Sequence, residues 1–116
     1  MKYIKTYENI TELKDVKDAD INDYVICEDI AVEAEKVRNF IRSNIGQIIK
    51  KTHSKTTHNN NLIKYEVKYE NIPDELVLNE FNPHTKARLM FEDEIKYCSA
   101  NINILELLLN QNKFNL

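Results

Sequence analysis

The side chains best suited to chemistry are three histidines and two cysteines, all of them common metal ligands. They are Cys27, Cys98, His53, His58 and His84. A zinc site usually shows paired ligands, either two cysteines with two residues between them or two histidines one helical turn apart. Neither spacing occurs in this sequence, so we expect no metal site and no cofactor. The two thiols are expected to be reduced and packed in the core, because nothing marks either as a nucleophile.

Carboxylates form the second chemically interesting group. Glu92, Asp93 and Glu94 are consecutive, and Glu28 and Asp29 are expected to lie near them across paired strands. Two carboxylates can act as acid and base when burial separates their pKa values, but consecutive acids on a turn usually stay in water. A phosphate-binding loop needs several glycines, and the chain has one. We therefore expect no enzyme activity and keep a small metal-dependent hydrolase as the weakest alternative.

The most distinctive charge feature is a basic middle third in a protein whose net charge is −3. Seven Lys or Arg residues and no acid lie between positions 36 and 65, whereas both flanking regions are acidic. Such a segment favours a polyanion or an acidic protein surface as partner. The predicted binding residues are Arg38, Arg42, Lys50, Lys51, Lys55, Lys64 and Lys68. Tyr65 and Tyr69 are expected to point inward, which removes them as stacking platforms for bases.

Length and composition bound the class of protein. The chain has 116 residues, which suits one domain. Its 42% hydrophobic and 30% charged residues argue against general disorder. No apolar run approaches the ~20 residues of a membrane span, and the first residues lack the apolar core of a secretory signal. We expect a cytoplasmic protein that does not associate with membranes.

Hydrophobic periodicity predicts the elements of the first half. Residues 24–28, YVICE, predict a mostly buried strand. Residues 31–43 repeat apolar positions every three or four residues, which predicts an amphipathic helix. Gly46 follows that helix, where a left-handed residue commonly ends a helix. Residues 47–52 predict a second strand, and after a polar loop residues 62–70 alternate as a strand with one buried and one wet face.

The second half of the chain predicts shorter elements. Residues 74–81 lie between two proline turns and predict a short helix, and residues 86–91 predict a further strand. The side chains expected on one side of that strand are Ala87, Leu89 and Phe91. Residues 92–94 are expected to form a tight turn, and residues 95–98 to form a short last strand.

A leucine-rich helix is expected at residues 100–112, with Ser99 as its N-cap. Its inward stripe should consist of Ile102, Leu105, Leu108 and Leu109. This stripe is expected to close one end of the fold, and it could also support a weak homodimer. We therefore expect a monomer or a weak homodimer.

Together these elements predict a mainly β fold with added helices, a small SH3-like barrel of about five antiparallel strands. The barrel domain is expected over residues 21–116, after a polar lead-in over residues 1–20. In such a barrel the first and last strands pair, which would bring Cys27 near Cys98. The helix at residues 31–43 would occupy the first long loop.

Six segments carry a resemblance that covers most of the chain: MKYIKTYENI, DYVICED, FIRSNIGQIIK, YEVKYENIPDEL, EIKYCS and NKFNL. In these the chain resembles short uncharacterised proteins of tailed bacteriophages and of marine or Flavobacterium-type genomes. The resemblance implies an SH3-like module of phage type with no assigned activity and no catalytic residues. In those proteins a glycine usually precedes the DYV strand. Asn22 stands there in this chain, and Asn tolerates left-handed backbone better than most residues.

These observations predict a non-enzymatic interaction module that binds a host or phage protein in the host cytoplasm. Inhibition of a host system would be one such role. The alternative is a small barrel that binds nucleic acid through the basic segment at residues 36–65.

Overall fold

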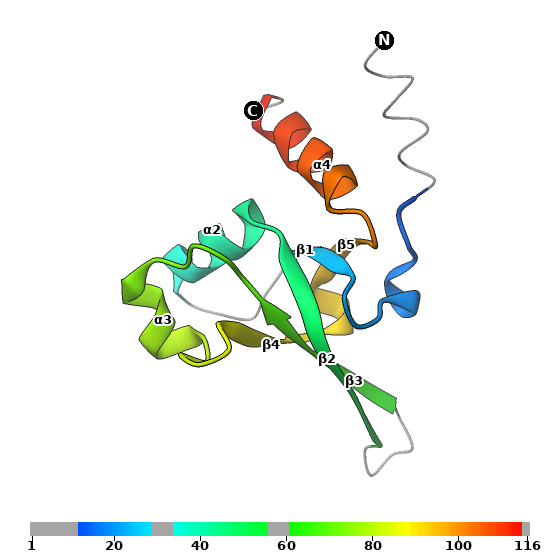
Figure 1. The fold of residues 1–116 in the computed structure, drawn as a ribbon, viewed down its shortest axis with the longest axis horizontal. Coiled ribbons are helices and arrows are strands. Elements are labelled where there is room, and N and C mark those ends of the chain that lie inside the picture. The colour runs from blue at the N-terminus through cyan, green and yellow to red at the C-terminus, as the bar shows by residue number, and fades with distance from the viewer. Residues whose placement is uncertain (1–11, 29–33, 56–60, 115–116) are drawn as a thin grey trace.

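The computed structural model describes residues 12–28, 34–55 and 61–114, and these form a five-stranded antiparallel sheet with flanking helices (Figure 1). The strands are β1 (Tyr24–Cys27), β2 (Gly46–Lys55), β3 (Asn61–Lys68), β4 (Ala87–Phe91) and β5 (Ile95–Ser99). The helices are η1 (Val16–Asp18), α2 (Glu35–Ser43), α3 (Asp74–Glu80), η2 (Glu92–Glu94) and α4 (Ile102–Phe114). Among these residues no helix is long and apolar enough to cross a membrane.

The order of strands across the sheet is β4-β3-β2-β1-β5. The predicted pairing of the first strand with the last is confirmed, since Val25 lies opposite Cys98 and Ile26 opposite Tyr97. The two edge strands, β4 and β5, are joined by the single turn of η2 but do not pair with each other in the described residues, so the sheet is open. The mixed α/β domain therefore has the predicted strands and added helices without a closed barrel.

Helix α2 lies in the connection between β1 and β2, as predicted, and begins at Glu35; positions 31–33 of the predicted helix lie outside the described residues. Its buried side chains Val37 and Ile41 pack on the sheet near β1. Phe40 makes edge-to-face contacts with Tyr69 at 5.7 Å and with Phe81 at 5.9 Å between ring centroids. These contacts define the inner face of the sheet, which α2 covers.

Gly46 plays a different role from the predicted left-handed helix end. It is the first residue of β2, and no glycine of the described chain has a positive φ. A Cβ at this position would overlap the Val67 Cγ1 atom and lie 2.8 Å from the Tyr69 Cζ atom. Glycine is therefore required by the close approach of β2 to buried side chains of β3. Asn22 does have a left-handed backbone, with φ of 77°, as the sequence suggested, and Asn71 and Lys86 also have a positive φ.

A β-bulge in β2 decides which side chains face the core. The register with β3 shifts between Ile48 and Lys50, so Ile49 is the extra residue. Because one extra residue reverses the alternation, Lys50 lies on the outer face and Lys51 on the inner face. Opposite them, β3 alternates as predicted, with Tyr65 and Val67 fully buried.

Strand β4 alternates as predicted, with one side of apolar residues. Ala87, Leu89 and Phe91 do share one side, but it is the outer side, where Leu89 is 47% exposed. The inner positions are Met90, which is fully buried opposite Tyr65, and Arg88 opposite Val67. The sequence pattern did not indicate that this strand places an arginine on the inner side.

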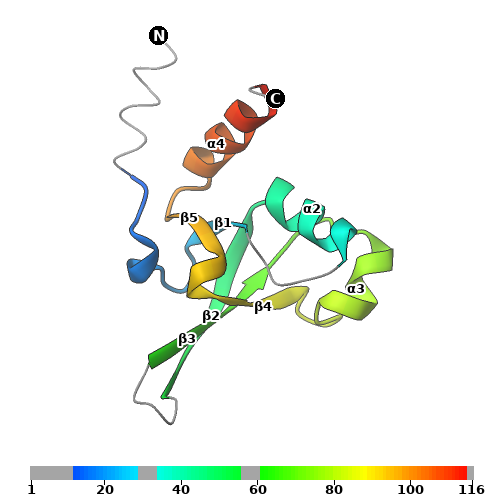
Figure 2. The ribbon, with the colours of Figure 1, turned by 180° about the vertical axis from the view of Figure 1, so that it is seen from behind.

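Helix α4 lies against β1 and β5 and projects away from the sheet (Figures 1 and 2). Of the predicted inward stripe only Leu105 is buried, together with Ile104. The other stripe residues, Ile102, Leu108 and Leu109, are half-buried, and Leu107, which is not part of the stripe, is 39% exposed. The N-cap is Asn101 and not the predicted Ser99, because the Asn101 side chain accepts a hydrogen bond from the Asn103 N–H in the first turn of α4. The Ser99 hydroxyl instead accepts a hydrogen bond from the Asn101 N–H.

Candidate interaction surface

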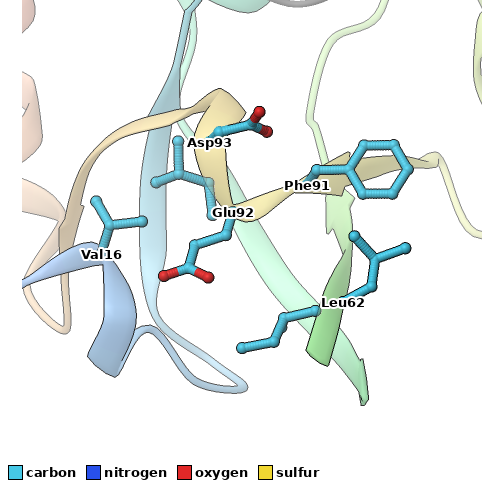
Figure 3. A pocket seen from close by; sticks show the side chains of 7 residues that line it. Val16, Leu62, Phe91, Glu92 and Asp93 are labelled. Atoms are coloured by element: carbon cyan, nitrogen blue, oxygen red, sulfur yellow. The ribbon is translucent and has the colours of Figure 1, made fainter. Parts of the chain in front are cut away.

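A pocket of about 730 Å³ opens between η1, the first residues of β3 and the η2 turn (Figure 3). Its lining residues are Val16, Leu62, Ile63, Phe91, Glu92, Asp93 and Ile95. Five of these side chains are apolar, and the two acids both come from η2. A concave, mostly apolar surface with a few polar groups is typical of a binding site.

Each wall of the pocket is held in place by local structure. Asp15 caps η1 by accepting a hydrogen bond from the Lys17 N–H at 3.1 Å, which fixes the turn that carries Val16. At the other wall, the Phe91 N–H donates to the Glu94 carboxylate at 2.9 Å and so fixes the start of η2. The remaining apolar wall comes from β3, where the strand runs past the end of β4.

Glu92 is the charged group at the centre of the pocket. Figure 3 shows its carboxylate between Val16 and the start of β3, whereas the Asp93 carboxylate points away from both. Neither acid forms an ion pair with a residue that the structure describes. Burial is the main cause that raises the pKa of the Tyr65 hydroxyl to about 12. The negative charge of the nearby Glu92 adds to this shift. The pocket thus combines apolar walls with a negative charge that no described residue pairs.

The other predicted acids do not join this site. The Glu28 N–H donates to the Glu94 carbonyl oxygen at 2.8 Å, so the two segments do meet. The Glu28 side chain is instead paired with Lys96 at 2.8 Å. Asp29 lies outside the described residues. Among the described side chains no three of the His, Cys, Asp and Glu type gather where they could hold a metal ion.

The structure brings together three of the seven predicted basic residues. Lys50, Lys64 and Lys68 lie on the outer face of the β2–β3 hairpin. Lys50 is 3.7 Å from the Glu66 carboxylate, and Lys68 is 3.9 Å from that of Glu70. Part of the positive charge on this face is therefore compensated by neighbouring acids.

The other basic residues lie elsewhere. Lys51 is on the inner face, where its Nζ donates to the Ala19 carbonyl oxygen at 2.8 Å and lies 5.8 Å from the Tyr65 ring centroid. Arg38 and Arg42 belong to α2, which packs on the inner face. Lys55 is in β2, but its side chain lies outside what the structure describes.

Cys27 and Cys98 are free thiols on neighbouring strands and are fully buried. Cys98 faces Val25 across the β1–β5 pair, so it is a diagonal neighbour of Cys27 on the same face. Burial raises the pKa of each thiol to about 12. Both are therefore protonated at neutral pH, in agreement with packed thiols.

A buried ion pair was missed by sequence reasoning. The Asp23 side chain is only 6% exposed, and Lys14 donates to its two oxygens at 2.9 and 2.8 Å. The Asp20 N–H and the Cys98 thiol also donate to Asp23, at 2.9 and 3.7 Å. The Lys14 backbone forms a β-bridge with Cys98, so residues 12–20 are tied to β5 and carry Val16 to the pocket. The sequence has four acids between positions 15 and 23, a pattern typical of a solvent-exposed segment, and nothing in it distinguishes Asp23 from Asp15, Asp18 and Asp20.

Comparison with known proteins adds no relative to this description. No family model matches the sequence, and neither a curated protein nor a solved structure matches the chain.

Proposed function

We propose that the protein is a non-enzymatic interaction module with an SH3-like architecture, of phage type, that binds a host or phage protein. The strand order, the pairing of β1 with β5 and the single helical turn between β4 and β5 support the architecture. Inhibition of a host system is one role that such a module would serve.

The observation that carries the binding proposal is the pocket at η2. Its apolar walls are open to solvent although the core beneath is fully packed, with Tyr65 and Met90 at 0% exposure. An apolar surface of this kind gains free energy when a partner covers it. The thiols are buried and protonated, so they do not supply a nucleophile.

The test is affinity capture from a host lysate, followed by titration of the purified captured protein. Leu62→Asp places a charge in the pocket wall, and Leu107→Asp is the matched control on exposed α4. We expect Leu62→Asp to weaken binding at least tenfold and Leu107→Asp to leave it unchanged, with both variants checked for thermal unfolding. A partner that binds all three proteins equally would refute binding at this pocket.

A second candidate function is nucleic-acid binding through the outer face of the β2–β3 hairpin. The observation that favours it is the shared face of Lys50, Lys64 and Lys68. Lysine side chains on one face of a sheet can contact the phosphates of a nucleic acid, and the affinity of such binding should fall steeply between 50 and 200 mM salt. Lys50→Glu with Lys64→Glu should abolish salt-sensitive binding to a DNA duplex. Binding that is undetectable in the unmodified protein would remove this candidate.

A further inference from the structure

We propose that the partner segment bound at the η2 pocket is an extended peptide, basic and apolar in alternation, that adds a strand to the exposed edge of β3. This inference rests on the proposed function and specifies the chemistry of its partner. Three features of the described residues carry it: a short free strand edge, an adjacent apolar pocket and an unpaired carboxylate.

The free edge arises because β3 is longer than its neighbour on one side. β3 pairs with β4 only from Lys64, opposite Phe91, to Lys68. The residues before Lys64 pair with β2 on their other side, with Leu62 opposite Ser54 and Ile63 opposite His53. The described chain places no strand beside them where β4 has turned into η2. Backbone N–H and C=O groups on such an edge are available to an incoming strand.

The pocket lies beside this edge and gives the added strand a place for a side chain. Leu62 and Ile63 belong both to the free edge and to the lining, while Phe91 and Ile95 complete the apolar walls. In an extended peptide every second side chain points to the same face. If one medium-sized apolar side chain of the peptide enters the pocket, the side chain two positions later therefore points to the same face.

Charge selects the rest of the peptide. The Glu92 carboxylate lies at the pocket, has no ion-pair partner among the described residues, and belongs to a turn of three consecutive acids. A Lys or Arg beside the apolar residue meets this negative charge, whereas an acidic peptide is repelled. A proline-rich segment fits less well, because proline lacks the N–H that pairing with a strand edge requires.

The probe is a fluorescein-labelled heptapeptide in which lysine and valine alternate, measured by fluorescence anisotropy with the full chain. The matched probes are a glutamate–valine heptapeptide and the lysine–valine peptide with alternate backbone amides N-methylated. We expect the basic probe to bind at least ten times more tightly than the acidic one, and N-methylation to cost about tenfold. Glu92→Gln should weaken the basic probe by about two- to fivefold, and Leu107→Asp should not change it.

Several outcomes would overturn the inference. They are no measurable binding of the basic probe, equal binding of the basic and acidic probes, and insensitivity to N-methylation. A dimer by light scattering that Leu62→Asp converts to monomer would also overturn it, because a second copy would then occupy the edge. If the protein captured from lysate depends on Leu62 while the basic probe fails, the proposed function stands and only the peptide chemistry is wrong. If capture from lysate does not depend on Leu62 and the basic probe does not bind, the proposed function and the peptide chemistry are both wrong.

Discussion

The ion pair between Lys14 and Asp23 allows a quantitative test of how the N-terminal segment is attached to the sheet. We choose Lys14→Met, which keeps the aliphatic stem and removes both hydrogen bonds to the buried carboxylate. Among the residues that the structure describes, Asp23 would retain only the Asp20 N–H and the Cys98 thiol as donors. The perturbation therefore leaves a charge 6% exposed and without its cation.

The expected loss follows from the burial of the two partners. Removing one member of a fully buried pair costs about 3–5 kcal/mol. The Lys14 side chain is 36% exposed, so water reaches one side of the pair and reduces this cost. We expect Lys14→Met to lower the free energy of unfolding by about 1–3 kcal/mol. Lys17→Met is the control, since Lys17 is 78% exposed and 4.0 Å from Asp15, and its effect should stay below about 0.5 kcal/mol.

The assay is urea unfolding followed by circular dichroism for a double-mutant cycle of Lys14→Met and Asp23→Asn. If the two groups interact as the distances indicate, the double variant should lose less than the sum of the single losses, with a coupling of about 1–2 kcal/mol. Additive effects within about 0.5 kcal/mol would refute the reasoning. The pKa of Lys14 is raised, mainly by its hydrogen bond to Asp23. The stabilisation should therefore be intact below the ordinary lysine value of 10.5 and disappear as pH rises through the raised value.

Four further predictions concern Gly46, the two thiols and Lys86. Gly46→Ala should destabilise the protein by about 1–3 kcal/mol in the same urea assay, because the new Cβ overlaps β3; a neutral effect would contradict the reason given for this glycine. Burial raises the pKa of Cys27 and Cys98 from 9.0 to about 12. As pH rises above about 9, these thiols therefore lose their protons in the unfolded state before they do in the folded state. The free energy of unfolding should fall over this range by at most about 1.4 kcal/mol per pH unit for each thiol. The same thiols should be unreactive toward a thiol reagent until the protein is unfolded, and rapid native labelling would refute their burial. Lys86 has a φ of 61°, a backbone conformation that glycine adopts without strain. Lys86→Gly should therefore stabilise the protein by about 0.5 kcal/mol, after subtraction of the entropy that glycine adds to the unfolded state. A clear loss of stability in thermal melts would show that the lysine side chain contributes more than the backbone strain.

Sequence patterns predicted the strands well where local alternation is strong. Tyr65, Val67 and Tyr69 are buried on one face as expected, because period-two burial is a local property. The pairing of the first and last strands also followed from the order of elements. The bulge at Ile49 could not be predicted, since it depends on the register with a neighbouring strand. It turned Lys50 to the outer face and Lys51 to the inner face, the reverse of what unbroken alternation from Ile48 would give.

The pocket was not predictable for a different reason. Its walls come from segments as distant in sequence as Val16 and Ile95, and no spacing rule relates them. Glu92 was noticed only as part of an acidic turn, because its significance depends on the apolar side chains around it. Gly46 was recognised as structurally important, but the reason is a tertiary approach of Val67 and Tyr69 that a single sequence does not display.

The position of β1 between β2 and β5 has a consequence for how the chain folds during synthesis. The contact that joins Asp23 to Cys98 spans 75 positions, and at about 5–20 residues per second the ribosome needs about 4–15 s to deliver the second after the first. The β2–β3 hairpin closes locally within microseconds, whereas the apolar strand Tyr24–Cys27 waits for its β5 partner. During those seconds β2 is the only strand that can pair with β1, so the other edge of this apolar strand stays unpaired, which makes β1 the segment that chaperones would hold and the segment where aggregation would begin.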